Sequence, residues 1–475
     1  MNDHGKVRIK SWGRVASILF LIAIAALASY LLVTPDPTVP VADLMPIQLG
    51  GYQRLLILAP HCDDETLSSA GLILAAQRAG MQVRVVIATN GDGFLFATMQ
   101  NFWKIYPKPS DFIRMGELRQ QESLAALEIL GVRSEQVTFL SYPDRGTPEL
   151  WNNHWAASDP YQSPYSGDTR SPYPITYNPK AVYAGVDYLK DLTSILESYQ
   201  PDLIVYPHPM DVHPDHWGLN VFTRLALSIL RHQDPTYITT ELTYLVHRPD
   251  FPEIKGLIPK EHLTPPYAIY KLSRNWIRLD LSPSDTTIKG QAIKAYRSQL
   301  PLLHNLMDSF VRADEAFSPV ADTNLVTKAG GNLKDPSTWF DPAGVPIPPV
   351  QLDPVADYTT RDLIPAGDLT AVYAAQDMQG NLGVCAKLRE KTVPEIIYIL
   401  RMKILTDNGI STYQAQTGEL QAGWHPLDRS DTVACLKVSL ADLGNPWAVF
   451  LGATTVAGGR IEDETAWQMI HINLP

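Results

Sequence analysis

The sequence predicts an α/β domain built on a mostly parallel sheet, preceded by an N-terminal transmembrane helix and followed by an all-β sandwich domain. Three observations lead to this prediction. Apolar runs alternate with helical segments from about Gly51 to about Leu130, strand-like runs fill the C-terminal part, and an uncharged apolar stretch lies near the N-terminus. At 475 residues the chain is too long for one ordinary core, so two or more domains are expected.

The N-terminal segment is typical of a membrane anchor. Four basic residues within 1–14 lead into Val15–Val33, which has 19 residues and no charge. As a helix this stretch spans roughly 28 Å, close to the hydrocarbon thickness of a bilayer. Because basic flanks stay in the cytoplasm, the body of the chain is expected outside the membrane, joined by a tether at 34–50. A cleaved signal peptide is the alternative, since Ala26–Ala28 resembles a cleavage site.

The region 51–329 predicts one α/β domain. Its apolar runs are near-continuous, as strands buried on both faces require. Helices between consecutive strands make the sheet parallel and cover both of its faces, in a Rossmann-like arrangement. The predicted strands are Arg54–Ala59, Gln82–Ala88, Gln136–Leu140, Leu203–Tyr206 and one near Leu242–Val246. The predicted helices are Glu65–Ala79, Ile113–Leu130, Ala181–Tyr199, His216–Leu230 and one from about Thr286 to Leu303.

A long aromatic segment, Glu149 to Lys180, interrupts this alternation. It holds two tryptophans and four tyrosines among Pro, Ser, Asn and Gly. A loop of this length in a compact domain is usually functional or disordered, and the aromatic content argues against disorder. Two interpretations stay open: an insertion packed on its own rings, or a lid that contacts a substrate.

The C-terminal part predicts a β-sandwich module at 355–475, after a Pro/Gly-rich linker at 330–354. Short apolar runs are separated there by Gly, Asn and Asp, without a long helical period. The module could bind carbohydrate, bind a partner or serve as a spacer. Its candidate stacking residues are Trp424, Trp447 and Trp467, although most tryptophans in small sandwiches belong to the core, which is the favoured interpretation.

The cysteines bear on the redox compartment of the protein, and the net charge bears on the class of partner it can bind. Cys385 and Cys435 either pair in an oxidising compartment or remain two buried thiols. The net charge of −11 implies no basic surface, so nucleic acid is not an expected partner. The sequence leaves the oligomeric state open.

Two segments rich in histidine and carboxylate, Pro60–Glu65 and His208–His216, each directly follow a predicted strand. The carboxyl ends of parallel strands meet at one edge of the sheet, where ligands bind. There His61, Asp64 and His216 would offer a metal two nitrogens, one carboxylate oxygen and an open position. This donor set is typical of a catalytic rather than a structural zinc site. The metal would lower the pKa of a bound water from about 15.7 to about 7.

The remaining polar residues of the two segments suggest the rest of a catalytic site. Asp63 points away if Asp64 binds the metal, and it is placed to take the proton of the water as general base, an effect of ~10²–10⁴-fold. His213 could stabilise an oxyanion and later protonate a leaving amine. Glu65, Asp211 and Asp215 are expected to orient the ligand side chains without binding the metal themselves.

The two segments resemble the signatures of the PIG-L/LmbE-like N-acetylglucosaminyl deacetylases, Pro/Ala-His-Pro-Asp-Asp-Glu and His-x-Asp-His. Further similarity covers about Tyr52 to Phe317. It includes Arg119–Glu122 in the helix after the second strand, Tyr142–Gly146 in the loop after the third strand, and Tyr296–Gln299 with Arg312–Phe317, which compare with a C-terminal helix of the family.

This resemblance implies zinc-dependent hydrolysis of the acetamide of an amino sugar, with release of acetate. It implies the same zinc ligands, general base and oxyanion stabiliser as above, and it adds Arg119 and Asp144 as contacts of the sugar. The other interpretations are an ion pair of Arg119 with Glu122 and a turn-capping role for Asp144. Cys62 departs from the family pattern, because it replaces a proline that would stiffen the turn. Its thiol is expected to point into the protein.

The sequence therefore predicts a zinc-dependent de-N-acetylase in the cell membrane, with a single span and an extracytoplasmic body, acting on an N-acetylated amino sugar of a glycan or glycoconjugate. Fe²⁺ is the alternative metal. The alternative functions are a zinc amidase on a non-sugar N-acyl substrate and a non-catalytic glycan-binding surface protein. Asp63 and His213 argue against the binder, because it has no use for a base beside a metal-bound water.

Overall fold

The computed structural model describes residues 37–320, 323–357 and 363–472. The predicted basic segment 1–14 and transmembrane helix 15–33 lie outside these residues. In the described part of the chain, no helix combines the length and the apolar character needed to cross a membrane. The chain divides into two compact units, Met1–Val39 and Pro40–Pro475, and the second unit contains everything described below.

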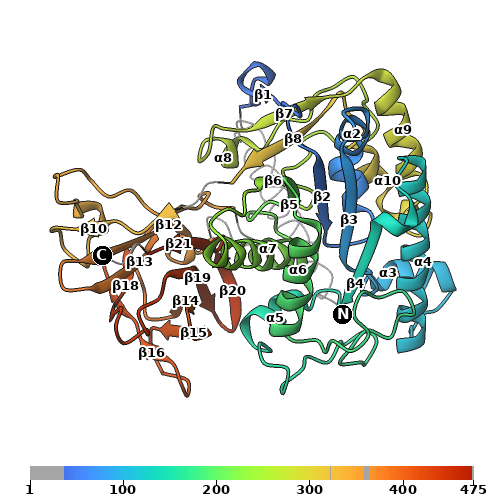
Figure 1. The fold of residues 1–475 in the computed structure, drawn as a ribbon. Coiled ribbons are helices and arrows are strands. Elements are labelled where there is room, and N and C mark those ends of the chain that lie inside the picture. Colours follow the sequence, from blue (N-terminus) through green and yellow to red (C-terminus); the bar gives the residue numbers. More distant parts are fainter. Residues whose placement is uncertain (1–36, 321–322, 358–362, 473–475) are drawn as a thin grey trace, which may run out of the picture. The chain divides into compact units, whose positions relative to one another are not determined.

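The main sheet has eight strands among the described residues, in the order β1-β7-β8-β6-β5-β2-β3-β4 (Figure 1). The strands are β1 (Met45–Pro46), β2 (Arg54–Ala59), β3 (Gln82–Thr89), β4 (Val137–Tyr142), β5 (Leu203–Pro207), β6 (Thr240–Tyr244), β7 (Ile277–Asp280) and β8 (Asp314–Pro319). β6, β5, β2, β3 and β4 are parallel, whereas β8 is antiparallel to both β6 and β7. The predicted α/β fold is confirmed, with a mixed sheet.

Helices cover both faces of this sheet. They are α2 (Asp64–Arg78), α3 (Leu95–Phe102), α4 (Pro109–Ile129), α5 (Thr147–Asn152), α6 (Gly185–Tyr199), α7 (Pro214–Gln233), α8 (Tyr267–Tyr270), α9 (Pro283–Ile293) and α10 (Leu300–Asp308). α5, α6 and α7 contact one another, and α9 contacts α2, α4 and α10. Leu56 and Leu58 of β2 belong to the core beneath α6 and α7. Since side chains alternate across a strand, the buried Leu55 and Ile57 face the other side.

Two predictions for the end of the domain are wrong. The helix predicted from about Thr286 to Leu303 is two helices, α9 and α10, because Pro301 tolerates only the first turn of a helix and α10 begins one residue before it. The segment Arg312–Phe317, compared above with a helix, instead leads into strand β8, whose residues are almost all buried.

The C-terminal part is β-rich and consists of two sheets. One contains β10 (Thr327–Lys328), β11 (Gln351–Leu352), β12 (Leu369–Asp377), β13 (Asn381–Leu388), β17 (Asp428–Ser430) and β18 (Val433–Ser439). The other contains β9 (Thr323–Asn324), β14 (Ile396–Thr406), β15 (Gly409–Gln416), β16 (His425–Pro426), β19 (Ala448–Ala457), β20 (Arg460–Glu464) and β21 (Gln468–His471). Val372 and Val384 of the first sheet share one core with Leu400 and Met402 of the second.

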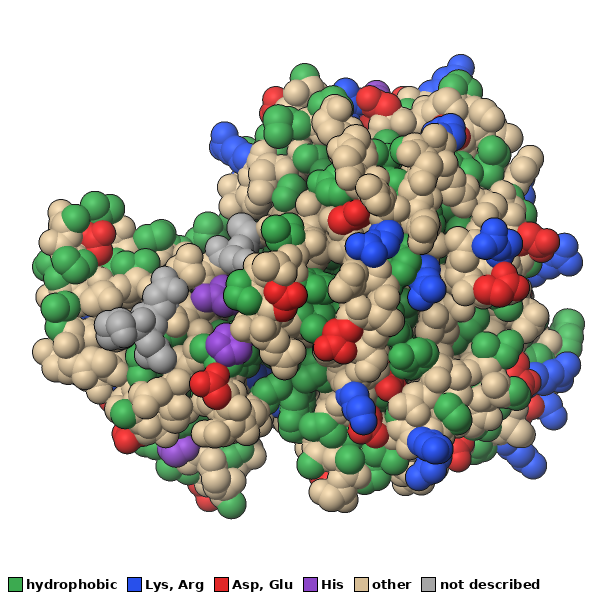
Figure 2. Space-filling view, in the orientation of Figure 1, with side chains coloured by type: hydrophobic (Ala, Val, Ile, Leu, Met, Phe, Trp, Pro, Cys, Tyr) green, Lys and Arg blue, Asp and Glu red, His purple; other side chains and the backbone are tan. Residues whose placement is uncertain are grey.

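The segment 330–354, predicted as a linker, packs onto this β-rich region. It supplies β11, which pairs with β12, and Trp339, which is 1% exposed. On the same sheet, Cys385 of β13 and Cys435 of β18 are direct partners in the strand register and form a disulfide. Of the two interpretations given above, the pairing is therefore the one observed. On the face shown in Figure 2, basic side chains are scattered rather than gathered into one patch.

The aromatic segment joins the α/β region to the β-rich region. Trp151 of α5 is fully buried and lies edge-on to Phe222 of α7, Phe450 of β19 and Trp467. Trp155 stacks on Phe222. These two rings are packed in a core, but that core includes rings of α7 and of the β-rich region and not only those of the segment itself. Trp467 is 5% exposed and also belongs to that core, as the favoured interpretation had it.

Candidate active site

The turn between β2 and α2 carries the first cluster of polar residues. Asp63 caps the N-terminus of α2 with a φ of 145°, a conformation that costs a non-glycine residue ~1–3 kcal/mol. Its N–H donates to Glu65 Oε2 at 3.0 Å, while the N–H of His61 donates to Asp64 Oδ2 at 3.0 Å. The Asp64 carboxylate thus turns toward His61, whereas Asp63 Oδ2 lies 3.0 Å from Nη2 of Arg119.

The turn between β5 and α7 carries the second cluster. His213 caps α7, and Pro214 occupies its first turn, where a missing N–H is tolerated. The Nδ1 atom of His213 accepts a hydrogen bond from the N–H of Asp215 at 3.3 Å. His216 follows in the same turn and is fully buried. The parallel pairing of β2 with β5 brings this turn beside the first one.

The two turns converge on Asp64. Its Oδ2 atom lies 3.0 Å from Nδ1 of His61 and 3.0 Å from Nε2 of His216. His247, which follows β6, lies with its Nε2 3.7 Å from the Oδ1 atom of Asp64. One possible ligand atom from each of these four residues lies within 4.8 Å of the other three. His247 was missed in the sequence, although it directly follows a predicted strand, which is the neighbour of β5 in the sheet.

Each of the two buried imidazoles has a further carboxylate on its other nitrogen. His61 Nε2 lies 3.2 Å from Asp215 Oδ2, and His216 Nδ1 lies 3.1 Å from Asp211 Oδ2. Asp215 accepts from the N–H groups of Arg145 and Thr147 and from the hydroxyl of Thr147, and Asp211 accepts from the N–H groups of Val246 and His247. Carboxylates behind histidine ligands fix ring orientation in metal sites.

The donors fit a metal ion. Asp64 Oδ1 is buried and has no hydrogen-bond partner among the described residues, and the two buried ring nitrogens of His216 have only carboxylate oxygens beside them, at 3.0 and 3.1 Å. Buried polar atoms without partners are rare in proteins unless they serve an ion or a reaction. Two imidazole nitrogens and a carboxylate oxygen are ligands that zinc accepts.

Charge in this cluster favours a cation. Burial alone lowers the pKa of an imidazole, but Asp211 and Asp64 outweigh it and raise the pKa of His216 to about 9. Burial likewise opposes ionisation of Asp64, yet His216 and His61 hold its pKa well below the usual 3.8. The cluster thus retains positive charge between its carboxylates, and a metal ion can replace the protons of the imidazoles.

His213 differs from the other histidines. Its ring lies edge-on to that of His61, with centroids 4.5 Å apart. Burial, together with His61, His247 and His216, lowers its pKa well below 6.5, so the ring is neutral. Because Nδ1 accepts a backbone hydrogen bond, the hydrogen of the neutral ring is on Nε2.

Arg119 of α4 is bound to the first turn. It donates to the carbonyl oxygens of Gly91 and Cys62 at 2.7 Å each and to Asp63 Oδ2 at 3.0 Å. The ion pair with Glu122 is not formed, because Glu122 accepts instead from Ser298. Burial raises the pKa of Asp63 to about 7, against the opposing effect of Arg119.

The other predicted residues also lie at this site. Asp144 accepts from the N–H of Gly93 at 2.6 Å, and its Oδ1 atom lies 3.4 Å from Nε2 of His61, so it faces the histidine cluster. Glu65 accepts from the hydroxyls of Ser123 and Tyr296 and supports the Asp63 turn. The side chain of Cys62 is fully buried and forms no disulfide.

Comparison with known proteins agrees with this geometry. Residues 56–227 match the family model PIG-L, described as GlcNAc-PI de-N-acetylase. A 1D-myo-inositol 2-acetamido-2-deoxy-alpha-D-glucopyranoside deacetylase of Mycobacterium sp. (strain KMS) is 29% identical over 194 residues, covering 40% of this chain and 55% of the relative. Its counterpart in Corynebacterium glutamicum (strain R) is 25% identical over 181 residues, covering 36% of this chain and 52% of the relative. The chain thus spans about half the length of the curated relatives it matches.

Among solved structures, N,N'-diacetylchitobiose deacetylase from Pyrococcus horikoshii aligns with a TM-score of 0.36 at 17% identity, covering 57% of this chain and 84% of that one. The family match lies over β2 to α7 and includes both metal-motif turns. Over residues 56–227, the chain is therefore similar to the PIG-L family.

Proposed function

We propose that this protein is a metal-dependent de-N-acetylase that hydrolyses the acetamide of an N-acetylated amino sugar. One observation carries the proposal. His61, Asp64 and His216 converge from two strand ends, with a carboxylate behind each imidazole and Asp63 beside them. His61, Asp64 and His216 would hold the metal, zinc by the donor set or Fe²⁺ as the alternative. When bound, the metal would activate water and polarise the amide carbonyl.

Asp63 would act as the general base. Arg119 holds the Oδ2 atom of Asp63 at 3.0 Å, which fixes the direction of the carboxylate. The buried guanidinium is already occupied by three acceptors from the Asp63 turn and Gly91. We therefore assign Arg119 to positioning Asp63 rather than to contact with the sugar. Asp144 keeps the proposed role of sugar contact, since it faces the histidine cluster.

His213 would act on the carbonyl oxygen. As a neutral ring with its hydrogen on Nε2, it can donate to the oxygen on which negative charge develops, and donors of this kind are worth ~10²–10³-fold in rate. As the C–N bond of the tetrahedral intermediate breaks, the leaving amine would take a proton either from Asp63, which gained one from the water, or from Nε2 of His213. Asp63 and His213 together thus cover the proton transfers that amide hydrolysis needs.

The proposed substrate class rests on the relatives, which act on a 2-acetamido-2-deoxy-glucopyranoside. The test is a screen of N-acetylglucosamine conjugates and oligosaccharides with the purified protein, reading out released acetate and free amine in equal amounts. Release from at least one amino sugar, abolished by a chelator, is expected. Hydrolysis confined to non-sugar N-acyl compounds would contradict the proposed substrate class and favour an amidase instead.

We further propose that the body of the protein works outside the cytoplasmic membrane, anchored by the N-terminal segment. The Cys385–Cys435 disulfide supports an oxidising compartment, because such bonds are rare in the cytosol. Protease added to intact cells is expected to degrade the body of the chain. Full protection of the body until the cells are lysed would contradict this orientation.

Asp211→Asn is expected to lower metal affinity ~10–100-fold, the usual effect of changing a group behind a ligand. Asp211 Oδ2 lies 3.1 Å from His216 Nδ1, and the amide would weaken its hold on the ring without removing a ligand. Competition with a chelator measures the affinity, and excess metal should restore activity. The exposed Asp234→Asn serves as control. Equal metal affinities in both variants would show that Asp211 does not support the metal site.

A further inference from the structure

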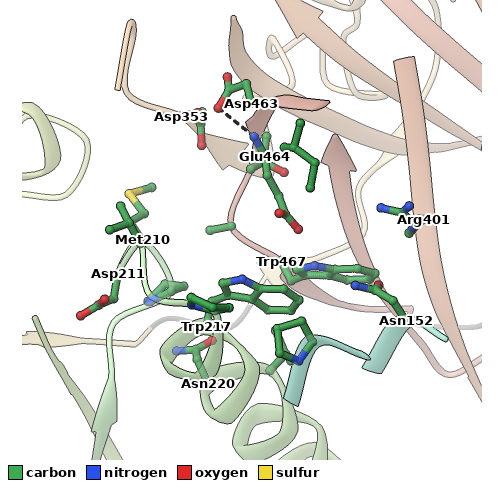
Figure 3. Close-up of a pocket in the computed structure, with 18 of the residues that line it drawn as sticks. Asn152, Met210, Asp211, Trp217, Asn220, Asp353, Arg401, Asp463, Glu464 and Trp467 are labelled. Carbon is green, nitrogen blue, oxygen red and sulfur yellow. Dashed lines mark hydrogen bonds between the residues drawn. The ribbon is translucent and has the colours of Figure 1, made fainter. Parts of the chain in front are cut away.

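A second group of carboxylates lies away from the histidine cluster, in the β-rich region. Asp353 follows β11, Asp463 lies on β20, and Asp357 lies four residues after Asp353. One carboxylate oxygen from each lies within 4.8 Å of the other two. They line a cavity of ≈ 400 Å³ whose walls also include the Met210–Val212 loop and Trp217 (Figure 3).

Two carboxylate oxygens of this group lack hydrogen-bond partners among the described residues. Asp353 is 6% exposed, and its Oδ2 atom has no hydrogen-bond partner among the described residues; the same holds for Asp357 Oδ1. Figure 3 shows Asp353 and Asp463 side by side at the cavity. A buried carboxylate without a partner is costly unless a cation or a proton neutralises it.

The protein supplies little positive charge here. Arg248 Nη1 lies 3.7 Å from Asp357 Oδ2, but its guanidinium already binds Asp250 with contacts of 2.9 and 3.3 Å. Burial, together with repulsion from Asp463, Asp357 and Asp368, raises the pKa of Asp353 well above 3.8. Three acidic groups that line one cavity therefore require a species that neutralises their charge.

From this geometry we infer that Asp353, Asp357 and Asp463 form a binding site for a divalent cation of the calcium class. Carboxylate oxygens alone suit hard cations, and nitrogen or sulfur ligands are not part of the cluster. Calcium takes six to eight oxygens in flexible geometry, so three carboxylates and cavity waters can complete its shell. Magnesium requires a near-ideal octahedron, which side chains from separate segments are less suited to provide.

Such an ion would tie together segments that are distant in sequence. The N–H of Asp353 donates to the carbonyl oxygen of Thr370, and the N–H of Leu369 donates to Asp463 Oδ2 at 2.6 Å. Both acidic residues are thus fastened to the start of β12. Arg248, beside Asp357, also donates to the carbonyl oxygen of Met210 in the loop before His213. Calcium would therefore stabilise the contact between the β-rich region and that loop, independently of the catalytic metal.

Equilibrium dialysis of the full-length protein against calcium tests this inference. We expect one calcium per chain, half-saturated at or below about 1 mM, the range of extracellular calcium modules. Asp353→Asn should lower the affinity more than about tenfold, a loss that changes outside the ligand shell already cause. Asp442→Asn, on an exposed turn of the same region, should bind as the wild type does. His216→Ala should also retain calcium, which separates this site from the catalytic cluster.

Thermal unfolding tests the inference by a second, independent measurement. In a chelator, Asp353→Asn should melt at or above the wild-type temperature, because it removes a buried repelling charge. Added calcium should raise the melting temperature of the wild type but not that of the variant. The inference fails if the wild type takes up no calcium, if Asp353→Asn binds equally well, if His216→Ala abolishes uptake, or if magnesium binds as tightly. A variant that melts lower in chelator would also overturn it, since the carboxylate would then stabilise the fold without an ion.

Discussion

Asp63→Asn is expected to lower the turnover number ~10²–10⁴-fold while the protein keeps its metal. Asparagine has the shape of aspartate and can still accept the hydrogen bond from Arg119, which lies 3.0 Å from Oδ2. It cannot take a proton from water at neutral pH. The metal should stay bound because His61, Asp64 and His216 are unchanged. Acetate release gives the rate, and elemental analysis gives the metal content.

Two outcomes would contradict this role of Asp63. Wild-type turnover in the variant would show that another group accepts the proton. Loss of the metal together with the activity would show that Asp63 is a ligand or that its turn collapses. Glu117→Gln, an exposed residue of α4 on the same helix as Arg119, is the matched control and should retain full activity.

Trp151→Ala is expected to lower the free energy of unfolding by ~3–5 kcal/mol, the range for deleting a fully buried aromatic side chain. Trp151 is 0% exposed and contacts Phe222, Phe450 and Trp467, which come from both the α/β region and the β-rich region. The surrounding rings cannot refill the space, so the cavity persists. Denaturant titration monitored by circular dichroism measures the change.

Trp103→Ala is the control for this prediction, since Trp103 is 93% exposed and its loss should change stability little. A similarly small change for Trp151→Ala would mean that the stability of the two regions does not depend on their shared core. The expected large loss would instead make the β-rich region part of the folded body that carries the histidine cluster. It would also argue against the interpretation of this region as a mere spacer.

The sequence predicted much of the site because parallel strands impose a simple geometry. β2 and β5 are neighbours, so the turns that follow them lie side by side; the first carries His61 and the second leads into α7, which carries His216 in its first turn. The same reasoning applied to β6 would have pointed to His247. Motif and topology together therefore predict which turns meet at the edge of a sheet.

Other features depend on contacts that sequence spacing does not reveal. The partner of Arg119 is Asp63, which lies 56 residues away, rather than Glu122 one helical turn along. Asp353 follows β11 in one sheet and Asp463 lies on β20 in the other, so they meet only because the two sheets pack together, and neither lies in a recognisable motif. Pro301 lies in the first turn of α10 and indicates that a helix starts there, whereas the hydrophobic pattern alone predicted one continuous helix.

The most direct measurement is the location of the metal in crystals of the purified protein by anomalous scattering at a metal absorption edge. We expect one ion per chain bound to His61, Asp64 and His216, and its loss in His216→Ala. A second possible cluster, formed by His61, His213 and Asp215, provides the sharpest contrast. An ion held by that cluster, or full activity in metal-free protein, would contradict the assignment of ligands and the reaction built on it.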